Sequence, residues 1–362
     1  MLIISLIMVA GILLLVGILL LLSPGNPTPF VDKNGAPLEG SISEKIRVKI
    51  NGIDQGMFIK SKDGTRPVLL FLHGGPGMPE YFLTKRYPTG LEDIFTVVWW
   101  DQRGSGLSYN AEVPLETMTV EQMISDTLEV TEYLRKRFGK EKIFLMAHSG
   151  GSHIGIQAAA RAPELFHAYL GVAQMSFQLR SESMAYEYML KQFKNNGNKR
   201  MVRKLEKAPP TVDAPLPSSY AALRDKAMHG LGIGTTHDMR SVITGVFLPS
   251  WLFREYTLGE KIGLWRGKFT SMRLLRDAVF ATDLSKNVRE LDLPVYFFHG
   301  IFDQTVSYTL ARSYFAELKA PLKGFYTFDR SAHSPMFEEP EKMRKILQLD
   351  VMVGDNNLAD EG

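Results

Sequence analysis

The sequence predicts an α/β protein with a mostly parallel sheet and helices on both faces. Short apolar runs alternate along the chain with helical segments, which is the order typical of such a sheet. Several runs are apolar throughout, as expected for strands that are covered on both faces. A third observation is a stretch of about 115 residues, 175–292, without strand-like runs, which predicts a helical insertion between two strands.

The individual elements follow from the same patterns. The residues 42–50 and 57–61 flank Asn51-Gly52, a hairpin signal, and Ile53 to Gly56 are expected to lengthen the turn. Helices are expected at 119–138, with Thr119 and Gln122 as a capping box, at 152–166, at 306–318 and from Pro340 onward. The expected strands of the parallel sheet are 67–74, 94–101, 142–147, 168–173, 294–300 and 323–329.

Composition narrows the class of protein. The chain of 362 residues is long enough for one globular domain with an insertion or for two modest domains. It is 45% hydrophobic and 22% charged, and its net charge of +3 indicates no nucleic-acid partner. The chain has no cysteine, so disulfides and thiolate sites are excluded. It also has no His-x-x-His or His-Glu-x-x-His pair, so we expect neither a metal nor another cofactor. The basic stretch 194–207 is read as a solvated helix face rather than as a site for an anionic surface.

Residues 1–22 carry no charge and are long enough, as a helix, to cross the hydrocarbon core of a bilayer. The alternative is a cleaved signal peptide, but no basic residue precedes the run and no small-x-small site follows it. We therefore expect a single-pass membrane anchor followed by a Pro- and Gly-rich linker, 23–41. We expect the catalytic part on the extracytoplasmic side of the membrane, although the charges that flank the helix do not determine its orientation.

The most informative stretch is Ala147-His148-Ser149-Gly150-Gly151. An expected strand precedes it and an expected helix follows it, which is the context of a nucleophile elbow. Small residues flank Ser149 at −2 and +2, whereas Ser152 has Ile154 at +2, where a branched side chain would crowd the turn. The sequence therefore favours Ser149 as a nucleophile.

A nucleophilic serine needs a histidine base and a carboxylate that orients the base. Asp303 follows the expected strand 294–300, and His333 lies in the loop after the strand 323–329. The chain order Ser, Asp, His is the order expected for an elbow of this kind. Both residues follow the carboxyl ends of strands, where the active sites of open α/β sheets lie.

Acyl transfer also needs N–H donors for the oxyanion. The amide of Gly150, directly after the nucleophile, is one candidate, and the glycine-rich loop 73–77 after an early strand supplies the other. A phosphate-binding loop is not indicated, because no Gly-Lys-Ser/Thr follows.

Three motifs together resemble the proline iminopeptidase branch of the α/β-hydrolases: HGGPG at 73–77, DQRGSG at 101–106 and AHSGGS at 147–152. The resemblance covers about residues 42–352. It implies an α/β-hydrolase fold with a core at 42–174 and 293–353 and a helical cap at 175–292. It also implies Ser149, Asp303 and His333 as triad, with the amides of Gly75 and Gly150 as oxyanion hole. Asp101 and Arg103 are then expected to organise a turn near the site.

The resemblance further implies a substrate amine held by glutamates of the cap. Glu182 and Glu187 are the residues named for this role, and Glu255 is a third cap carboxylate. The chain departs from the peptidases in two ways, since the usual Trp-containing cap segment has no match and the residue after the nucleophile is Gly150 rather than an aromatic.

The leading hypothesis is thus a membrane-anchored serine hydrolase. The preferred activity is that of an aminopeptidase acting on a short peptide or a small molecule. An esterase or lipase is the alternative within the same machinery. A non-enzymatic binding protein on the same scaffold is the alternative from another class. Dehalogenase and epoxide-hydrolase chemistry need an aspartate at the elbow, where this chain has Ser149.

Overall fold

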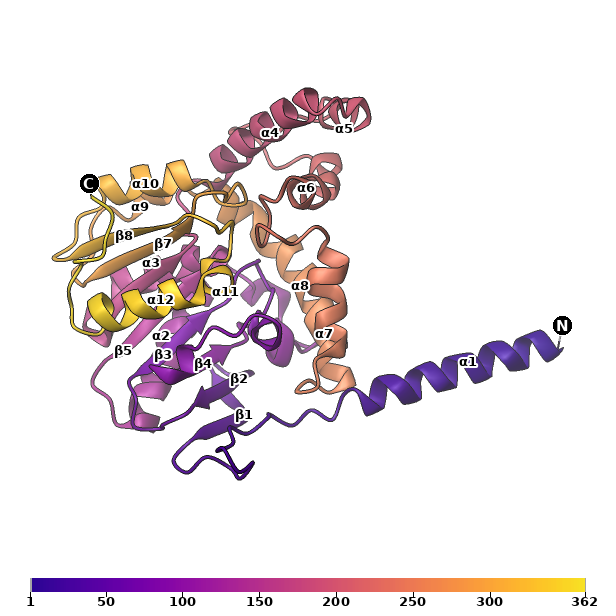
Figure 1. The fold of residues 1–362 in the computed structure, drawn as a ribbon, viewed down its shortest axis with the longest axis horizontal. Coiled ribbons are helices and arrows are strands. Elements are labelled where there is room, and N and C mark those ends of the chain that lie inside the picture. Colours follow the sequence, from indigo (N-terminus) through magenta and orange to yellow (C-terminus); the bar gives the residue numbers. More distant parts are fainter. Residues whose placement is uncertain (1, 362) are drawn as a thin grey trace.

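The structure, a computed structural model, describes residues 2–361. Eight strands form one sheet in the order β1-β2-β4-β3-β5-β6-β7-β8 (Figure 1). β2 pairs antiparallel with β1 and with β4, and every later pair is parallel. The chain thus has the mostly parallel sheet that the sequence predicts. The strands are β1 (Ile42–Ile50), β2 (Ile53–Ser61), β3 (Val68–Leu72), β4 (Thr96–Trp100), β5 (Ile143–His148), β6 (Phe166–Val172), β7 (Val295–Gly300) and β8 (Lys323–Phe328).

The parallel strands are buried on both faces. In β3, Leu70 and Leu72 belong to the core under α2 (Val120–Phe138), α3 (Gly150–Arg161) and α10 (Tyr308–Glu317). The alternate residues Leu69 and Phe71 belong to a second core, which includes residues of α12 (Pro340–Ile346). Because successive side chains of a strand point to opposite faces, a run that is apolar throughout fills both cores.

Between β6 and β7 the chain forms the helices that stand over one end of the sheet (Figure 1). They have a small apolar core of their own, which includes Leu179, Met189, Tyr220 and Met228. We call residues 175–292 the cap. The cap helices are α4 (Gln178–Asn195), α5 (Lys199–Leu205), α6 (Ser218–Leu231), the π-helical segment Ile243–Phe247, α7 (Leu248–Leu252), α8 (Leu258–Ala281) and α9 (Leu284–Asn287).

The first helix, α1 (Leu2–Leu21), projects away from the rest of the protein (Figure 1). Among the described residues it is the one helix long and apolar enough to cross a membrane, with a mean hydropathy of 3.1 over Ile4–Leu21. None of this window is buried against the protein. A short helix, α11 (Pro335–Glu338), precedes α12 near the end of the chain.

Three local expectations are corrected. The hairpin turn is tight, because Ile50 pairs with Ile53 and the positive φ of Asn51 (44°) and Gly52 (80°) matches a two-residue turn whose twist fits the strands. Gln122 completes only half of a capping box: its amide N–H donates to Thr119, while its side chain turns to Asp126.

The third correction concerns α3. It begins at Gly150 and ends at Arg161, not at 152 and 166. Pro163 opens a separate short turn, and Phe166 already starts β6. A proline has no N–H for the helix ladder, and it restricts the residue before it, so the helix stops ahead of Pro163.

Candidate active site

Ser149 occupies the sharp turn between β5 and α3. Its backbone has φ 53° and ψ −123°, a conformation that residues other than glycine rarely adopt. Its neighbours show why the turn needs small residues. A Cβ on Gly151 would lie 2.5 Å from the carbonyl oxygen of Leu72. A Cβ on Gly155 would lie 2.7 Å from the methyl carbon of Ala147, which is too close for two carbon atoms. The turn therefore holds the Ser149 hydroxyl above the sheet at a cost in backbone strain.

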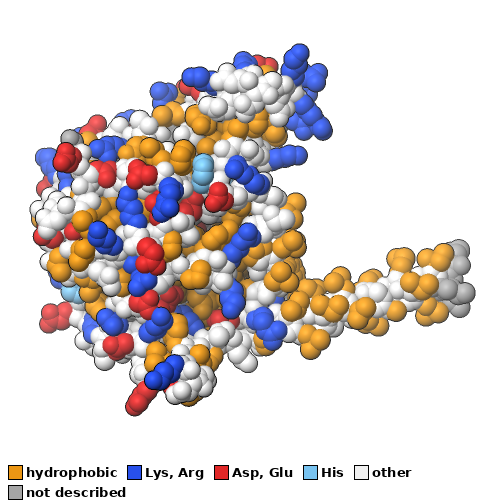
Figure 2. All heavy atoms as spheres, in the orientation of Figure 1, with side chains coloured by type: hydrophobic (Ala, Val, Ile, Leu, Met, Phe, Trp, Pro, Cys, Tyr) orange, Lys and Arg blue, Asp and Glu red, His pale blue; other side chains and the backbone are white. Residues whose placement is uncertain are grey.

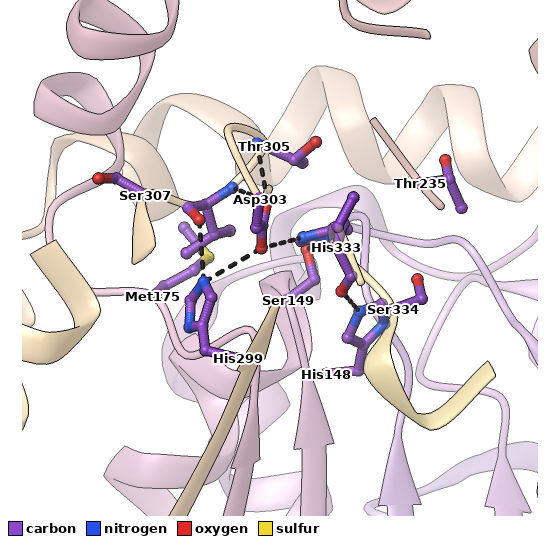
Figure 3. A network of polar contacts seen from close by, with 12 residues as sticks. His148, Ser149, Met175, Thr235, His299, Asp303, Thr305, Ser307, His333 and Ser334 are labelled. Carbon is purple, nitrogen blue, oxygen red and sulfur yellow. Dashed lines mark hydrogen bonds and ion pairs between the residues drawn. The ribbon is translucent and has the colours of Figure 1, made fainter. Parts of the chain in front are cut away.

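The structure brings Ser149, His333 and Asp303 into one hydrogen-bonded line (Figure 3). The Ser149 hydroxyl lies 2.8 Å from Nε2 of His333. Nδ1 of His333 lies 2.8 Å from Oδ2 of Asp303. Asp303 follows β7 and His333 follows β8, so the parallel strands deliver the three groups to one edge of the sheet. A carboxylate can only accept here, so His333 donates its Nδ1–H and leaves Nε2 free to take the serine proton.

Asp303 is completely buried but well supplied with donors. Its Oδ1 accepts the amides of Thr305 (2.8 Å) and Val306 (2.9 Å), and Nε2 of His299 lies 3.1 Å from Oδ2. Burial alone would raise the pKa of Asp303, but His333 and His299 outweigh it and lower the pKa below its usual range. Asp303 is therefore ionised at neutral pH and can stabilise a positive charge on His333.

The loop that carries His333 is fixed from two sides. Nε2 of His148 lies 2.9 Å from the carbonyl oxygen of His333, and Nδ1 of His148 lies 2.8 Å from Oε1 of Glu80. On the other side, the Glu338 carboxylate accepts the amides of Ala332 (3.0 Å) and Ser334 (3.2 Å). These contacts hold the backbone on both flanks of the histidine, so its ring has little freedom to leave the line to Ser149.

Gly75 and Gly150, the two residues expected to stabilise an oxyanion, lie against each other. A Cβ on Gly150 would fall 2.7 Å from the carbonyl oxygen and 3.2 Å from the amide nitrogen of Gly75. Gly150 is the first residue of α3, so its N–H has no partner within the helix. Gly75 has φ 117°, which glycine adopts readily and other residues do not. Both glycines therefore lie near Ser149, since Gly150 follows it in the chain and Gly75 lines the same cavity as Ser149.

The DQRGSG loop (101–106) is hydrogen-bonded to the HGGPG loop (73–77) and holds it in place. The amide of Gln102 donates to Nε2 of His73 (3.1 Å), and its side chain donates to the His73 carbonyl (2.9 Å). Asp101 accepts the amide of Leu107 at 2.7 Å. Arg103 forms a buried bidentate ion pair with Asp126, with Nε 2.6 Å from Oδ2 and Nη2 2.8 Å from Oδ1. Asp101 and Arg103 thus organise the turn through buried polar contacts.

A cavity of about 250 Å³ lies between this site and the cap. Its floor includes Gly75, Ser149 and His333, and its cap wall comes from α6, α8 and the π-helical segment. Of the two cap glutamates named from sequence, neither lines it. Glu182 is fully buried inside the cap, where Arg224 binds it at 2.7 Å and the Tyr220 hydroxyl donates to it at 3.1 Å. Glu187 is exposed on the outer side of α4.

Glu255 is also engaged elsewhere, since it accepts the hydroxyl of Tyr81 at 2.8 Å. The acidic residues that do line the cavity are Glu80 and Asp225. Within residues 2–361, no group of three or more His, Asp or Glu side chains is arranged to hold a metal ion.

Comparison with known proteins agrees with this geometry. The sequence profile of the α/β-hydrolase fold family matches residues 67–340. A probable aminopeptidase of Bacillus subtilis, YbaC, is 32% identical over 313 residues, which is 86% of this chain and 97% of the relative. This chain belongs to the α/β-hydrolase family.

Solved structures show the same fold. A proline iminopeptidase from Mycobacterium smegmatis superposes with a TM-score of 0.60 at 14% identity, covering 84% of this hydrolase and 96% of that chain. A proline iminopeptidase-related protein from Thermus thermophilus gives a TM-score of 0.56 at 21% identity and covers 85% and 98% of the two chains. At these identities the likeness concerns the fold of the hydrolase alone.

Three residues near the site of this hydrolase have contacts that the sequence did not predict. The sequence patterns indicate no role for His148 or His299, although one contacts the His333 backbone and the other contacts Asp303. Glu80 was not singled out at all. Its position three residues after HGGPG is the one signal that could have found it, but a lone glutamate in a loop gives no sign of its tertiary partner.

Proposed function

We propose that this protein is a serine hydrolase that cleaves an amide or ester bond through an acyl-enzyme on Ser149. The observation that carries the proposal is the line from Asp303 through His333 to the Ser149 hydroxyl, with both contacts at 2.8 Å. This is the arrangement in which a histidine can accept a serine proton while a carboxylate orients its ring.

The reaction then proceeds in two halves. Ser149 Oγ attacks the carbonyl carbon of the substrate while Nε2 of His333 takes the hydroxyl proton. The amides of Gly75 and Gly150 stabilise the oxyanion, each such donor being worth about 10²–10³ in rate. The tetrahedral intermediate collapses as His333 returns the proton to the leaving amine or alcohol. A water molecule, deprotonated by His333, then attacks the acyl-enzyme, and His333 returns the proton to Ser149 Oγ as the acid is released.

For the substrate we propose a small aminoacyl compound or short peptide, so that the enzyme acts as an aminopeptidase. The probable aminopeptidase of Bacillus subtilis, similar over nearly its whole length, supports this choice. The cavity of about 250 Å³ suits a ligand the size of a dipeptide.

An esterase is the second candidate, and one observation favours it. Glu182, the cap carboxylate expected to bind a substrate amine, already has its charge compensated by Arg224. A site without a free cap carboxylate would accept uncharged acyl groups through the same triad. A non-enzymatic binding role finds less support, because Ser149, His333 and Asp303 are all present in working geometry.

We also propose that residues 1–22 anchor the protein in a membrane, with 23–41 as linker, 42–174 and 293–353 as the catalytic core and 175–292 as its cap. The exposed, uncharged helix α1 supports the anchor. The catalytic part is proposed to lie on the extracytoplasmic side.

A fluorophosphonate probe tests the mechanism. We expect covalent labelling of the wild type, no labelling of Ser149→Ala, and labelling of the matched control Ser152→Ala, whose hydroxyl is the other serine of the stretch. Labelling that survives in Ser149→Ala would refute the mechanism. Rates of hydrolysis of prolyl and alanyl arylamides, compared with those of short-chain acyl esters, then identify the substrate class. Hydrolysis of the esters alone would support the esterase and exclude the aminopeptidase.

A further inference from the structure

One edge of the cap exposes large apolar side chains. Figure 2 shows hydrophobic side chains gathered along α7 and α8, beside the base of α1. Isolated exposed hydrophobic residues are ordinary, but a contiguous group marks a contact surface. We call this group the cap edge: Ile243 (64% exposed), Phe247 (38%), Leu248 (45%), Leu252 (58%), Ile262 (42%) and Phe269 (67%).

Aromatic rings make the cap edge continuous. The ring of Phe247 lies 6.1 Å from that of Trp251 and 5.0 Å from that of Trp265. Trp265 in turn lies 6.3 Å from Phe269. Tryptophan and phenylalanine on an apolar surface are residues that settle at the boundary between lipid tails and headgroups.

The cap edge is tied to the end of α1. The ammonium of Lys261, in α8, donates to the carbonyl of Leu22 and the hydroxyl of Ser23, both at 2.8 Å. The amide of Gly25 donates to the carbonyl of Arg254 at 3.0 Å, between α7 and α8. The chain therefore leaves the anchor directly beside the cap edge, so a bilayer that holds α1 lies next to this surface.

A basic surface extends on the same side. Lys and Arg side chains crowd the end of the α4–α5 arm that points in the direction of α1 (Figures 1 and 2). All of them are exposed, and one acid, Glu206, is paired with Lys194 at 3.1 Å. We call this surface the basic arm: Lys194, Lys199, Arg200, Arg203, Lys204 and Lys207. Clustered cations of this kind are attracted to the negative surface of an anionic bilayer.

We propose that the cap edge and the basic arm rest on an anionic lipid bilayer, the same bilayer in which α1 is embedded. The proposal rests on the anchoring role proposed for α1. It has a consequence for the site, because Val242, Val246 and Lys268 line the active-site cavity and are sequence neighbours of Ile243, Phe247 and Phe269. The cap wall of the cavity is thus held at the membrane surface.

Because the chain has no cysteine, single cysteines can be labelled uniquely in the full-length protein. Leu252→Cys and Phe269→Cys probe the cap edge, and Leu13→Cys probes α1. Leu349→Cys (52% exposed) and Val353→Cys (66%) are matched apolar controls near the C-terminal end of the chain. Each is labelled with an environment-sensitive fluorophore in vesicles of phosphatidylcholine and phosphatidylglycerol, with and without lipids that carry a doxyl quencher, near the headgroup for the cap edge and the controls and deep in the acyl chain for Leu13.

We expect the lipid quencher to reduce fluorescence at Leu13, Leu252 and Phe269 and not at Leu349 or Val353. Quenching at Leu13 without quenching at the cap edge would overturn the docking while the anchor stands. Absence of quenching at Leu13 would remove the proposed anchor, and the docking proposal with it. Equal quenching at the cap edge and at the controls would show non-specific adsorption and would also overturn the proposal.

The basic arm has its own test. Replacing Lys199, Arg200, Arg203 and Lys204 together by alanine is expected to weaken quenching at Leu252 and to remove its dependence on anionic lipid and on salt. Alanine at two exposed cations elsewhere, Lys136 and Arg330, serves as the control and is expected to leave the quenching unchanged. The same loss in both variants, or in neither, would contradict a role of the basic arm.

Discussion

His148 donates a hydrogen bond from Nε2 to the carbonyl oxygen of His333, at 2.9 Å. Its other nitrogen faces Oε1 of Glu80 at 2.8 Å, an atom that also accepts the amide of Gly74 at 3.2 Å. Both partners of the ring are acceptors, an arrangement that favours the doubly protonated, positively charged form of His148. Burial opposes this charge, but the Glu80 carboxylate outweighs it and raises the pKa of His148. A buried ion pair thus supports the backbone of the residue proposed as base.

Breaking this ion pair should destabilise the fold. His148→Gln leaves the Glu80 carboxylate buried without its cation, which costs about 3 kcal/mol or more in free energy of unfolding. The double variant with Glu80→Gln should lose less than the sum of the two single variants, because the second change no longer breaks an intact pair. Urea unfolding of the four proteins measures this coupling, and strictly additive losses would contradict it.

The acid limb of activity should lie at unusually low pH. Burial lowers the pKa of His333, Asp303 opposes this, and the charge of His148 lowers it further, so the net pKa is below the ordinary 6.5. The base acts in its neutral form, so kcat/KM should be constant above this pKa and fall as the pH drops through it. His148→Gln removes one lowering charge and should move the limb to higher pH. A wild-type midpoint above 6.5 in a pH profile of kcat/KM would refute this prediction.

Relief of strain at the elbow should stabilise an inactive enzyme. Ser149→Gly lets the residue adopt φ 53° without a Cβ, where strain of about 1–3 kcal/mol is stored. Glycine also loses more entropy on folding, about 0.5–1 kcal/mol, so we expect a net gain of about 1 kcal/mol. Ser149→Ala is the control that lacks the hydroxyl but keeps the Cβ. Both should be inactive, and thermal unfolding should show the gain in the glycine variant alone.

A side chain after the proposed nucleophile should damage the proposed oxyanion site. A Cβ on Gly150 would meet the backbone of Gly75 at 2.7 Å, and the loop must move to admit it. We expect Gly150→Ala to lower kcat by about 10²-fold with a smaller effect on KM. Gly230→Ala, in α6, has nothing within 4 Å of the new methyl and should leave kcat unchanged. Equal kinetics in the two variants would exclude the close fit of these glycines.

The carboxylate that recognises a substrate amine should be Glu80 rather than Glu182. Glu80 lines the cavity with Ser149, and its Oε2 is buried with no hydrogen-bond partner within residues 2–361. We expect Glu80→Gln to lower the ratio of kcat/KM for an alanyl ester to that for a propionyl ester about tenfold or more.

Glu182→Gln is the matched control, because its carboxylate is bound by Arg224 and does not line the cavity, so the ratio should not change. Because both esters share the triad, the ratio is insensitive to a merely structural effect of Glu80 on His148. A change of the ratio in Glu182→Gln alone would assign the amine site to the cap.

Much of the fold follows from local pattern. The all-apolar runs around Leu70 and Leu145 predict strands covered on both faces, and both strands contribute alternate residues to the two cores. The order of Ser149, Asp303 and His333, each after a strand, predicts that parallel strands carry them to one edge, where they do meet. The tight turn at Asn51-Gly52 was missed because Ile53 to Gly56 read as loop until pairing with β1 drew them into a strand.

The sequence by itself determined the class of fold, the insertion between β6 and β7, and the three residues of the proposed triad, because strand periodicity and chain order are local properties. Only the tertiary structure decided which charges neutralise one another. Glu182 meets Arg224, Glu80 meets His148, and Gly150 meets Gly75 across gaps of 42, 68 and 75 positions in the chain. Such pairs depend on how distant segments pack, and no spacing along the chain encodes them.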